Sequence, residues 1–309
     1  MTMSNAHEYF LGKFGKEALD ITKDFKIPIK IDTSPTIVEP ISLHSKDKLP
    51  EIECLCLTYG RFQLLREAVS FFILQDYPNK FLTIINDAPI PLNEHNLPPN
   101  IKVMNCSKRF KTLGDKRQFA IRNAQKEIVA HWDDDDTYLP WHLYSCMKRL
   151  DKNKNILLVK PEETLIRLEG GKYSLSKGNW EASYVFYAKK ALEYGGYTSK
   201  DVGPETDMMK HFEKRCQIFF FSTWPYAQYI LDRSKSYTRI TQVNGEAFGK
   251  ISKDYGNFEF IIPSENYENW AKNLVSSRWM DYLNWMEKEI SKEQFKRIFE
   301  RFRIKIKGI

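Results

Sequence analysis

Four consecutive carboxylates, Asp133 to Asp136, are the residues of this sequence best suited to chemistry. They follow a short apolar, strand-like stretch that starts at Ile128. Two like charges about 4 Å apart repel by about 1 kcal/mol in water and by about 4 kcal/mol at an effective dielectric near 20. A divalent cation prefers oxygen ligands of this kind and removes the repulsion. The run therefore predicts either a metal site or a solvated acidic turn, in which Asp136 or Thr137 caps a helix that starts near Pro140.

Polar residues also follow other apolar stretches. Thr58 ends the stretch that begins at Ile52, and Asp87 follows residues 81–86. Apolar runs of this kind alternate with stretches of helical periodicity, which predicts an α/β fold with a mostly parallel, doubly wound sheet. Ligands bind such sheets beyond the carboxyl ends of the strands. We therefore expect Thr58, Asp87 and the acidic run at one edge of the sheet.

The elements that must position these residues follow from hydrophobic periodicity and from turn signals. Strands are expected at 52–58, 81–85, 101–104, 127–132, 156–159, 184–187, 218–222 and 226–231, and a hairpin at 164–175. Helices are expected at 64–74, 116–124, 141–150, 189–194, 208–214, 267–274, 279–286 and 291–302.

Size and charge limit the classes of protein to consider. With 309 residues, 42% of them hydrophobic, the chain is long enough for one large domain with appendages. We expect an N-terminal extension at 1–49, the main domain at 50–262 and a helical C-terminal extension at 263–309. The net charge of +7 fits anionic partners. An odd count of cysteines and the lack of a long apolar run predict a cytoplasmic protein without a transmembrane segment.

Eight segments resemble, in order and spacing, the motifs of the GT-A fold as found in glycosyltransferase family 2. The resemblance covers roughly residues 51 to 215. The segments are Glu53–Arg61, Leu74–Pro78, Ile84–Asp87, Leu113–Arg117, Ala120–Asn123, Ile128–Asp136 and Gly195–Tyr197, followed by Pro204–Asp207.

This resemblance implies a metal-dependent, inverting glycosyltransferase, a hexosyl- or pentosyltransferase. The donor would be a nucleotide-sugar, first of all a UDP-sugar, and the cofactor Mn²⁺ or Mg²⁺. By the same resemblance Asp135 and Asp133 bind the metal, and Asp133 also lies near the ribose, while Asp134 and Asp136 are bystanders. The other residues expected to bind the donor are Thr58, Arg61, Asp87, Lys116 and Arg117. Lys116 and Arg117 lie near a helix start, which favours anions.

An inverting transfer needs a general base at the acceptor hydroxyl, and two carboxylates compete for that role. The alignment favours Glu205 as the base with Asp207 as its structural partner, but a shift of one residue gives the role to Asp207. Trp132, Trp180 and Trp224 are expected in the core rather than stacked on a ligand.

The sequence leaves open two kinds of acceptor and two other classes of function. The acceptor is a glycan or lipid-linked saccharide, or a hydroxymethylated base in DNA of the kind that some bacteriophage glycosyltransferases modify. A basic C-terminal helix keeps the DNA acceptor open. The alternatives from other classes are a non-enzymatic nucleic-acid-binding protein and a nucleotidyltransferase. Four carboxylates argue against the first, and a glycine-poor loop after Thr58 argues against the second.

Overall fold

The computed structural model describes residues 49–94, 97–152, 155–168, 171–177, 181–221, 229–232 and 266–303. All of them belong to one compact unit, Asp32–Ile309. The extension expected at 1–49 lies outside the described residues except for Leu49, and so do Trp180 and Trp224. The boundaries expected at 262 and 263 also lie there, so they stay predictions.

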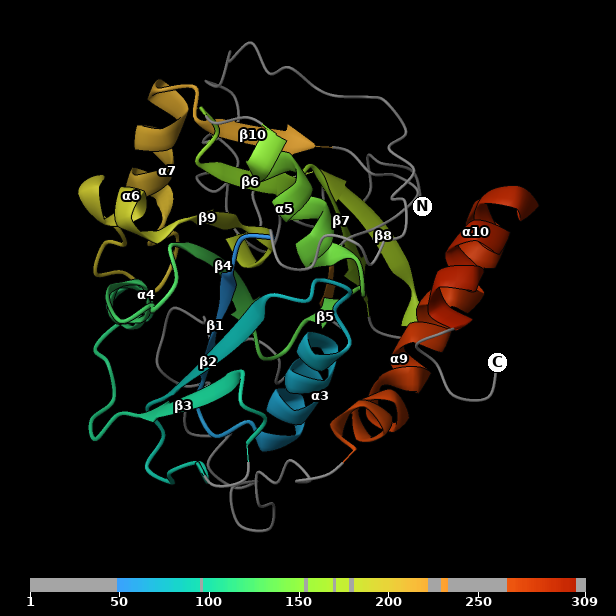
Figure 1. Ribbon diagram of the computed structural model, residues 1–309, viewed down its shortest axis with the longest axis horizontal. Coiled ribbons are helices and arrows are strands. Elements are labelled where there is room, and N and C mark those ends of the chain that lie inside the picture. Colours follow the sequence, from blue (N-terminus) through green and yellow to red (C-terminus); the bar gives the residue numbers. More distant parts are fainter. Residues whose placement is uncertain are drawn as a thin grey trace. The chain divides into compact units, whose positions relative to one another are not determined.

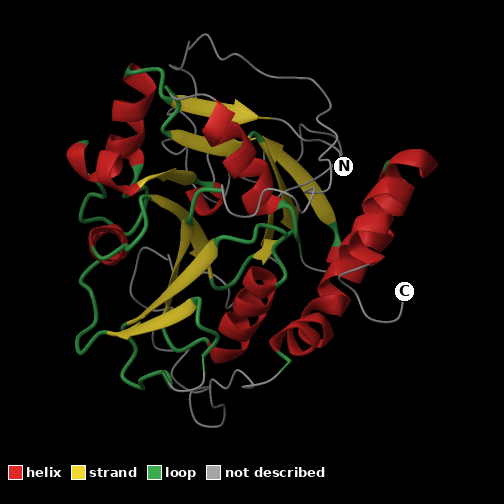
Figure 2. Cartoon of the chain, in the orientation of Figure 1, coloured by secondary structure: helices red, strands yellow, loops and turns green. Residues whose placement is uncertain are grey.

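Within the described residues, seven strands form the main sheet (Figures 1 and 2). Its order is β10-β6-β9-β4-β1-β2-β3, and β9 alone runs antiparallel to both of its neighbours. The strands are β1 (Ile52–Thr58), β2 (Lys80–Asn86), β3 (Ile101–Asn105), β4 (Ile128–Asp133), β6 (Leu158–Pro161), β9 (Val185–Tyr187) and β10 (Ile218–Phe221). The sheet is thus mostly parallel, as the sequence predicts.

The register of the central strands brings their carboxyl ends together. Thr58 pairs with Asn86 of β2, and Leu57 pairs with Asp133 of β4. The residues that follow these positions, Asp87 and Asp134, therefore leave the sheet at one edge.

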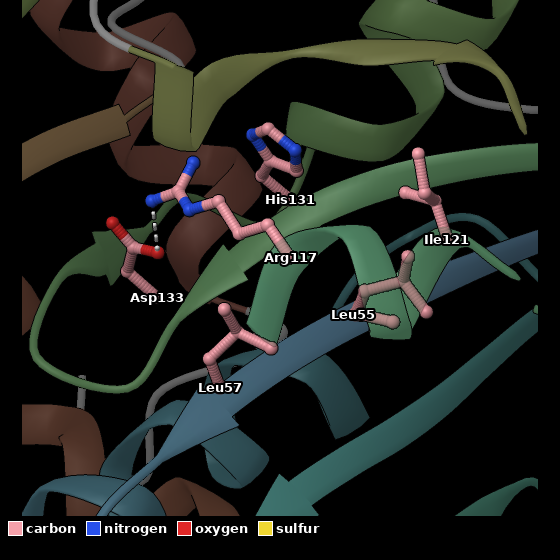
Figure 3. Close-up of a pocket in the computed structure, with 7 residues that line it drawn as sticks. Leu55, Leu57, Arg117, Ile121, His131 and Asp133 are labelled. Carbon is pink, nitrogen blue, oxygen red and sulfur yellow. Dashed lines mark ion pairs between the residues drawn. The ribbon is translucent and has the colours of Figure 1, made fainter. Parts of the chain in front are cut away.

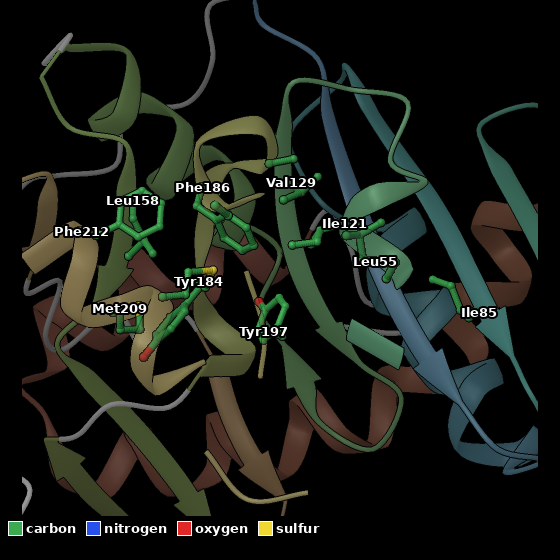
Figure 4. Packing of buried hydrophobic residues seen from close by; sticks show 14 residues of the cluster. Leu55, Ile85, Ile121, Val129, Leu158, Tyr184, Phe186, Tyr197, Met209 and Phe212 are labelled. Carbon is green, nitrogen blue, oxygen red and sulfur yellow. The ribbon is translucent and has the colours of Figure 1, made fainter. Parts of the chain in front are cut away.

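Helices cover both faces of this sheet. On β4, Val129 belongs to a buried cluster with Ile121 of α4 (Leu113–Arg122) and Phe212 of α7 (Thr206–Lys214), shown in Figure 4. Trp132 points to the opposite face, where its indole N–H donates to Ala68 O of α3 (Phe62–Ile73) at 3.0 Å. Trp132 is fully buried, so its expected place in the core is confirmed. The remaining helices of this region are α5 (His142–Lys152), α6 (Ala188–Glu193) and the short η3 (Glu181–Ser183).

Four strands of the described residues form a second sheet, which the sequence did not predict. Its order is β5-β11-β7-β8, built from β5 (Thr137–Tyr138), β11 (Tyr229–Asp232), β7 (Glu163–Arg167) and β8 (Tyr173–Lys177). The antiparallel pairing of β7 with β8 confirms the expected hairpin. The two-residue strand β5 is too short to give a periodic signal.

The C-terminal helices differ from the expectation in one respect. Residues 267–274 and 279–286 form one helix, α9 (Tyr267–Glu289), because the intervening Val-Ser-Ser-Arg contains no helix breaker. It packs along α3, with Arg278 paired to Glu67 at 2.6 Å. The final helix α10 (Lys292–Arg303) buries Phe302 against Trp279, at 5.2 Å between ring centroids. No described helix is both long and apolar enough to span a membrane.

Candidate active site

The acidic run is a turn that is fixed at both ends. It joins β4 to β5, and the Asp133 N–H donates to the Tyr138 hydroxyl at 2.8 Å. The Tyr138 hydroxyl donates in turn to Ala182 O at 3.1 Å, and its ring stacks on Trp132 at 3.7 Å. The predicted cap of a helix by Asp136 or Thr137 is wrong, because Thr137 lies in β5 and α5 begins only at His142.

Arg61 holds two of the four carboxylates. It follows Gly60, whose φ of +67° lies in the left-handed region that glycine adopts without strain. Its Nη1 donates to Asp135 Oδ2 at 2.8 Å, its Nε donates to Asp134 Oδ2 at 3.2 Å, and its Nη2 pairs with Asp134 Oδ1. Thr58 Oγ1 also donates to Asp134 Oδ2, at 2.7 Å. Asp134, 1% exposed, is therefore the carboxylate that ties β1 and its turn to β4.

The charges of this clamp depend on one another. Burial raises the pKa of Asp134 to about 6, Arg61 opposes this shift and Asp135 adds to it. Burial lowers the pKa of Arg61, but Asp134 and Asp135 outweigh burial and raise it overall. Arg61 is thus a permanent cation in a group of carboxylates that repel each other.

The other three carboxylates could hold a metal ion. Asp133, Asp135 and Asp136 each offer one oxygen, and these atoms all lie within 4.8 Å of one another. Asp133 and Asp135 are partly exposed, whereas Asp136 is 4% exposed. Hard oxygen ligands on a rigid turn suit Mg²⁺ or Mn²⁺. Asp136, expected to be a bystander, thus joins the two predicted ligands in this cluster.

Asp87 and Lys116 form a buried ion pair beside the acidic run. Lys116 Nζ donates to Asp87 Oδ1 and, at 2.6 Å, to Thr58 O. The Phe110 N–H donates to Asp87 Oδ2 at 3.1 Å. Burial lowers the pKa of Lys116, and Asp87 opposes that shift. Each oxygen of Asp87 thus accepts a bond from the protein, and each retains a second lone pair for a ligand.

Asn86 ends β2 directly before Asp87, and its amide makes three hydrogen bonds. Its Nδ2 donates to Ile90 O and to Asn105 Oδ1, both at 3.0 Å. Its Oδ1 accepts from the Ala88 N–H at 3.2 Å. Asn86 therefore orders the loop after β2, a role that needs a donor and an acceptor on one side chain.

Arg117 lines a small pocket together with Asp133 and His131 (Figure 3). Its Nη2 is 3.7 Å from Asp133 Oδ1, and its guanidinium carbon is 6.0 Å from the centroid of the Tyr197 ring. The Tyr197 hydroxyl contacts His131 Nε2. Arg117 thus connects the acidic run with the Gly-Gly-Tyr segment.

The two candidate bases differ in their surroundings. Glu205 is partly buried, and its Oε2 is a buried atom with no hydrogen-bond partner in the described part of the chain. The Asp207 side chain is 51% exposed and lies 3.9 Å from Lys200 Nζ and 3.8 Å from Lys210 Nζ. Asp207 is thus placed among solvated lysines, whereas Glu205 has an oxygen that no described group satisfies.

The first N–H groups of α4 are hydrogen-bonded to other residues of the chain. The Leu113 N–H donates to Asp201 Oδ1 at 3.0 Å, and the Gly114 N–H donates to Lys200 O at 2.9 Å. The Asp115 N–H donates to Thr112 Oγ1 at 3.1 Å. The segment 198–204 therefore occupies the helix start at which the sequence predicted an anion. Lys116 and Arg117 make their ion pairs with Asp87 and Asp133 through their side chains.

Residues 55–195 match the family model described as Glycosyl transferase family 2. This stretch includes β1, α4 and the whole acidic run.

The chain contains a glycosyltransferase family 2 domain.

The protein is accordingly a glycosyltransferase with a GT-A type of fold. Comparison with curated proteins finds no match. Among solved structures, TarS 1-349 of S. aureus in complex with UDP-GlcNAc is 12% identical over 80% of this chain and 78% of that chain, with a TM-score of 0.47. The mannosyltransferase PcManGT from Pyrobaculum calidifontis, in complex with GDP-Man and Mn²⁺, is 12% identical over 80% and 66%, with a TM-score of 0.42. At such scores the assignment rests on the family match.

In this glycosyltransferase the structure brings together the seven residues predicted on the donor side: Thr58, Arg61, Asp87, Lys116, Arg117, Asp133 and Asp135. It places Asp207 toward solvent instead. Sequence reasoning missed the clamp role of Asp134 and the place of Asp136 in the cluster. For Asp136 a signal existed, since it is the last carboxylate of the family-like motif. For Asp134 there was none, because its partners Thr58 and Arg61 are more than seventy residues away in sequence.

Proposed function

We propose that this glycosyltransferase is metal-dependent and inverting, and that it moves a hexosyl or pentosyl group from a nucleotide-sugar to an acceptor hydroxyl. The observation that carries the proposal is the cluster of Asp133, Asp135 and Asp136, whose oxygens converge within 4.8 Å at the carboxyl end of β4. A divalent cation there would act as a Lewis acid on the departing nucleoside diphosphate.

The charge balance of the site supports a divalent ion. The five carboxylates of Asp87 and Asp133–Asp136 face three cations, those of Arg61, Lys116 and Arg117. With all groups ionised, two negative charges remain. One Mg²⁺ or Mn²⁺ matches this excess, and the diphosphate of a donor would then bring its own charge to the metal, to the partly exposed Arg61 and to the buried Arg117.

On the donor side, we assign the nucleoside to the edge formed by Thr58, Asp87 and Lys116. These groups are held by hydrogen bonds among themselves and therefore need little reorganisation when a ligand binds. Asp133, partly exposed and next to Arg117, would lie near the ribose and the metal. A UDP-sugar is the first donor to examine.

On the acceptor side, we assign the general base to Glu205. Its buried, unsatisfied Oε2 is suited to accept a proton from a hydroxyl that approaches within hydrogen-bond distance. A base on the side of the sugar opposite to the diphosphate gives inversion at the anomeric carbon. Asp207 serves as a surface residue of α7.

The acceptor hydroxyl belongs to a saccharide, free or lipid-linked, or to a hydroxymethylated base in DNA. The described part of α10 weakens the argument for DNA, since Ile298 and Phe302 of this helix are buried. The five free cysteines fit a reducing cytoplasm. If DNA is the acceptor, retention of the protein on DNA falls steeply with salt. If the protein is not retained on DNA at low or at high salt, DNA is excluded and the acceptor is a saccharide.

Donor turnover tests the proposal. The purified protein is incubated with UDP-glucose, UDP-N-acetylglucosamine and GDP-mannose, with Mn²⁺, with Mg²⁺ and with a chelator. We expect release of the nucleoside diphosphate from one donor with a metal and none with the chelator, and the anomeric configuration of the released sugar by NMR to be inverted. Turnover that is undiminished by the chelator contradicts metal dependence, and retained configuration contradicts inversion.

A further inference from the structure

A tight backbone turn precedes Glu205. Both the N–H and the Oγ1 of Thr198 donate to Pro204 O, at 2.9 and 3.1 Å. The Thr206 Oγ1 donates to Gly203 O at 2.8 Å, and Gly203 has a φ of +61°, in the left-handed region. The place of Glu205 is therefore set by the backbone of its two neighbours and by the contact of Thr198 with Pro204.

Gly114, in the first turn of α4, lies directly against this segment. A Cβ on Gly114 would overlap the carbonyl oxygen of Thr198 and would lie 2.9 Å from Pro204 Cβ. A carbonyl and a proline ring cannot rotate away as the end of a flexible side chain can. The Gly114 N–H also donates to Lys200 O at 2.9 Å, so the helix and the segment are bonded at the same point.

A second contact, one helical turn further on, repeats the pattern. The Tyr197 N–H donates to Gln118 Oε1 at 2.8 Å. Gly196, with a φ of +65°, approaches the same amide so closely that a Cβ there would overlap Oε1. Between these two contacts on α4 stands Lys116, whose Nζ donates to Thr58 O at 2.6 Å. One helix therefore carries both a donor-side cation and the surface on which the segment before Glu205 rests.

We propose that Gly114 is a positioning residue for Glu205: its missing side chain lets α4 dock on Thr198 and Pro204 closely enough to place the base. The proposal rests on the proposed role of Glu205 as the base. Misplacement of a catalytic group by about 1 Å costs about a hundredfold in rate. A methyl group at Gly114 pushes on the carbonyl that fixes Pro204, and thus on Glu205.

A double-mutant cycle tests this in the full chain, with turnover of whichever of UDP-glucose, UDP-N-acetylglucosamine and GDP-mannose the wild type consumes. We expect Gly114→Ala to lower kcat about 10- to 100-fold with KM for the donor within about twofold. In the Glu205→Gln background the same substitution should lower kcat by less than about twofold, because it acts through the missing carboxylate. Equal losses in both backgrounds, or no loss from Gly114→Ala alone, overturn the proposal. A Glu205→Gln variant with full turnover instead refutes the base.

Two further measurements keep the result interpretable. Gly171→Ala is the control for a general loss of stability, since Gly171, unlike Gly114, has a positive φ and has nothing within 4 Å of an added Cβ. It should lower stability without changing kcat. Hydrogen exchange gives a readout that needs no donor: Gly114→Ala should speed exchange in 198–206 and leave β1 unchanged, and unchanged exchange in 198–206 contradicts the proposal. If Gly114→Ala fails to fold, Gln118→Ala replaces it, because this substitution removes the bond to the Tyr197 N–H. It should lower kcat less than Gly114→Ala would, and again only when Glu205 is present. If the losses from Gln118→Ala and Glu205→Gln are additive, the proposal is overturned.

Discussion

The proposed donor side and the proposed acceptor side of this site hold their carboxylates by different means. On the donor side, Asp134 and Asp135 share the guanidinium of Arg61, and Asp87 is paired with Lys116. On the acceptor side, Glu205 is placed by a backbone turn and keeps a buried oxygen with no hydrogen-bond partner among the described residues. The difference fits the roles we propose, because a carboxylate that binds a metal must stay charged, whereas a carboxylate that takes a proton needs an oxygen with no other hydrogen-bond partner.

The largest expected effect is the loss of a metal ligand. Asp135→Asn should lower donor turnover by about 10³-fold, because Lewis-acid stabilisation contributes several kcal/mol and each 1.36 kcal/mol is a factor of ten. Initial rates of diphosphate release measure the effect. Asp281→Asn, on the exposed partner of Arg167, is the control and should retain full rate. An Asp135→Asn variant with rates within threefold of wild type would show that the acidic run does not bind the metal.

The next effect concerns the acceptor side. Glu205→Gln should lower kcat by about 10²- to 10⁴-fold, the usual contribution of general base catalysis. Mn²⁺ binding should be unchanged, since no Glu205 oxygen belongs to the metal cluster. Kinetics and metal titration together separate the two sides. Loss of Mn²⁺ affinity in this variant would show that the two sides are not distinct.

A third experiment weakens the electrostatic clamp. Arg61→Ala leaves Asp134 buried and without its cation, so the free energy of unfolding should fall by about 3 kcal/mol at pH 7.5. Burial already raises the pKa of Asp134 to about 6, and the loss of Arg61 raises it further. Protonation at pH 5 then removes the buried charge, so the deficit relative to wild type should shrink. Urea unfolding at both pH values measures this, and an equal deficit at both would exclude Asp134 as its source.

The smallest effect is expected at Asp207. Its carboxylate is half exposed and lies 3.8 Å and 3.9 Å from two lysines, and exposed pairs of this kind contribute below about 1 kcal/mol. Asp207→Asn should retain kcat within about twofold and lower the free energy of unfolding by less than 1 kcal/mol. If Asp207→Asn abolished turnover while Glu205→Gln retained it, the two carboxylates would have to exchange roles.

The sequence predicted the sheet because its strands are apolar runs separated by helical periodicity, and each such run has a local signal. It also predicted that Thr58, Asp87 and the acidic run lie together, since a parallel sheet places the residues at the ends of β1, β2 and β4 at one edge. It did not predict the second sheet, whose strand β5 has two residues. The partnership of Arg61 with Asp134 was also missed, because a contact between residues so far apart in the chain depends on strand order.

The contact of Gly114 with Thr198 also joins residues that are far apart in sequence, and the sequence did not predict it. A glycine at a helix start is a weak signal by itself, and only the fold shows that a backbone carbonyl lies where a side chain would be. Our proposal of Glu205 rather than Asp207 as the base likewise depends on the exposure of the two side chains, which an alignment cannot reveal.

The central claim is that Asp133, Asp135 and Asp136 form a divalent metal site, and direct Mn²⁺ titration by electron paramagnetic resonance tests it most directly. We predict that the wild-type chain binds one Mn²⁺ and that Asp133→Asn and Asp135→Asn each weaken binding at least tenfold, while Asp281→Asn and Glu205→Gln leave it unchanged. Equal Mn²⁺ binding by the wild type and by the Asp133 and Asp135 variants would contradict the claim.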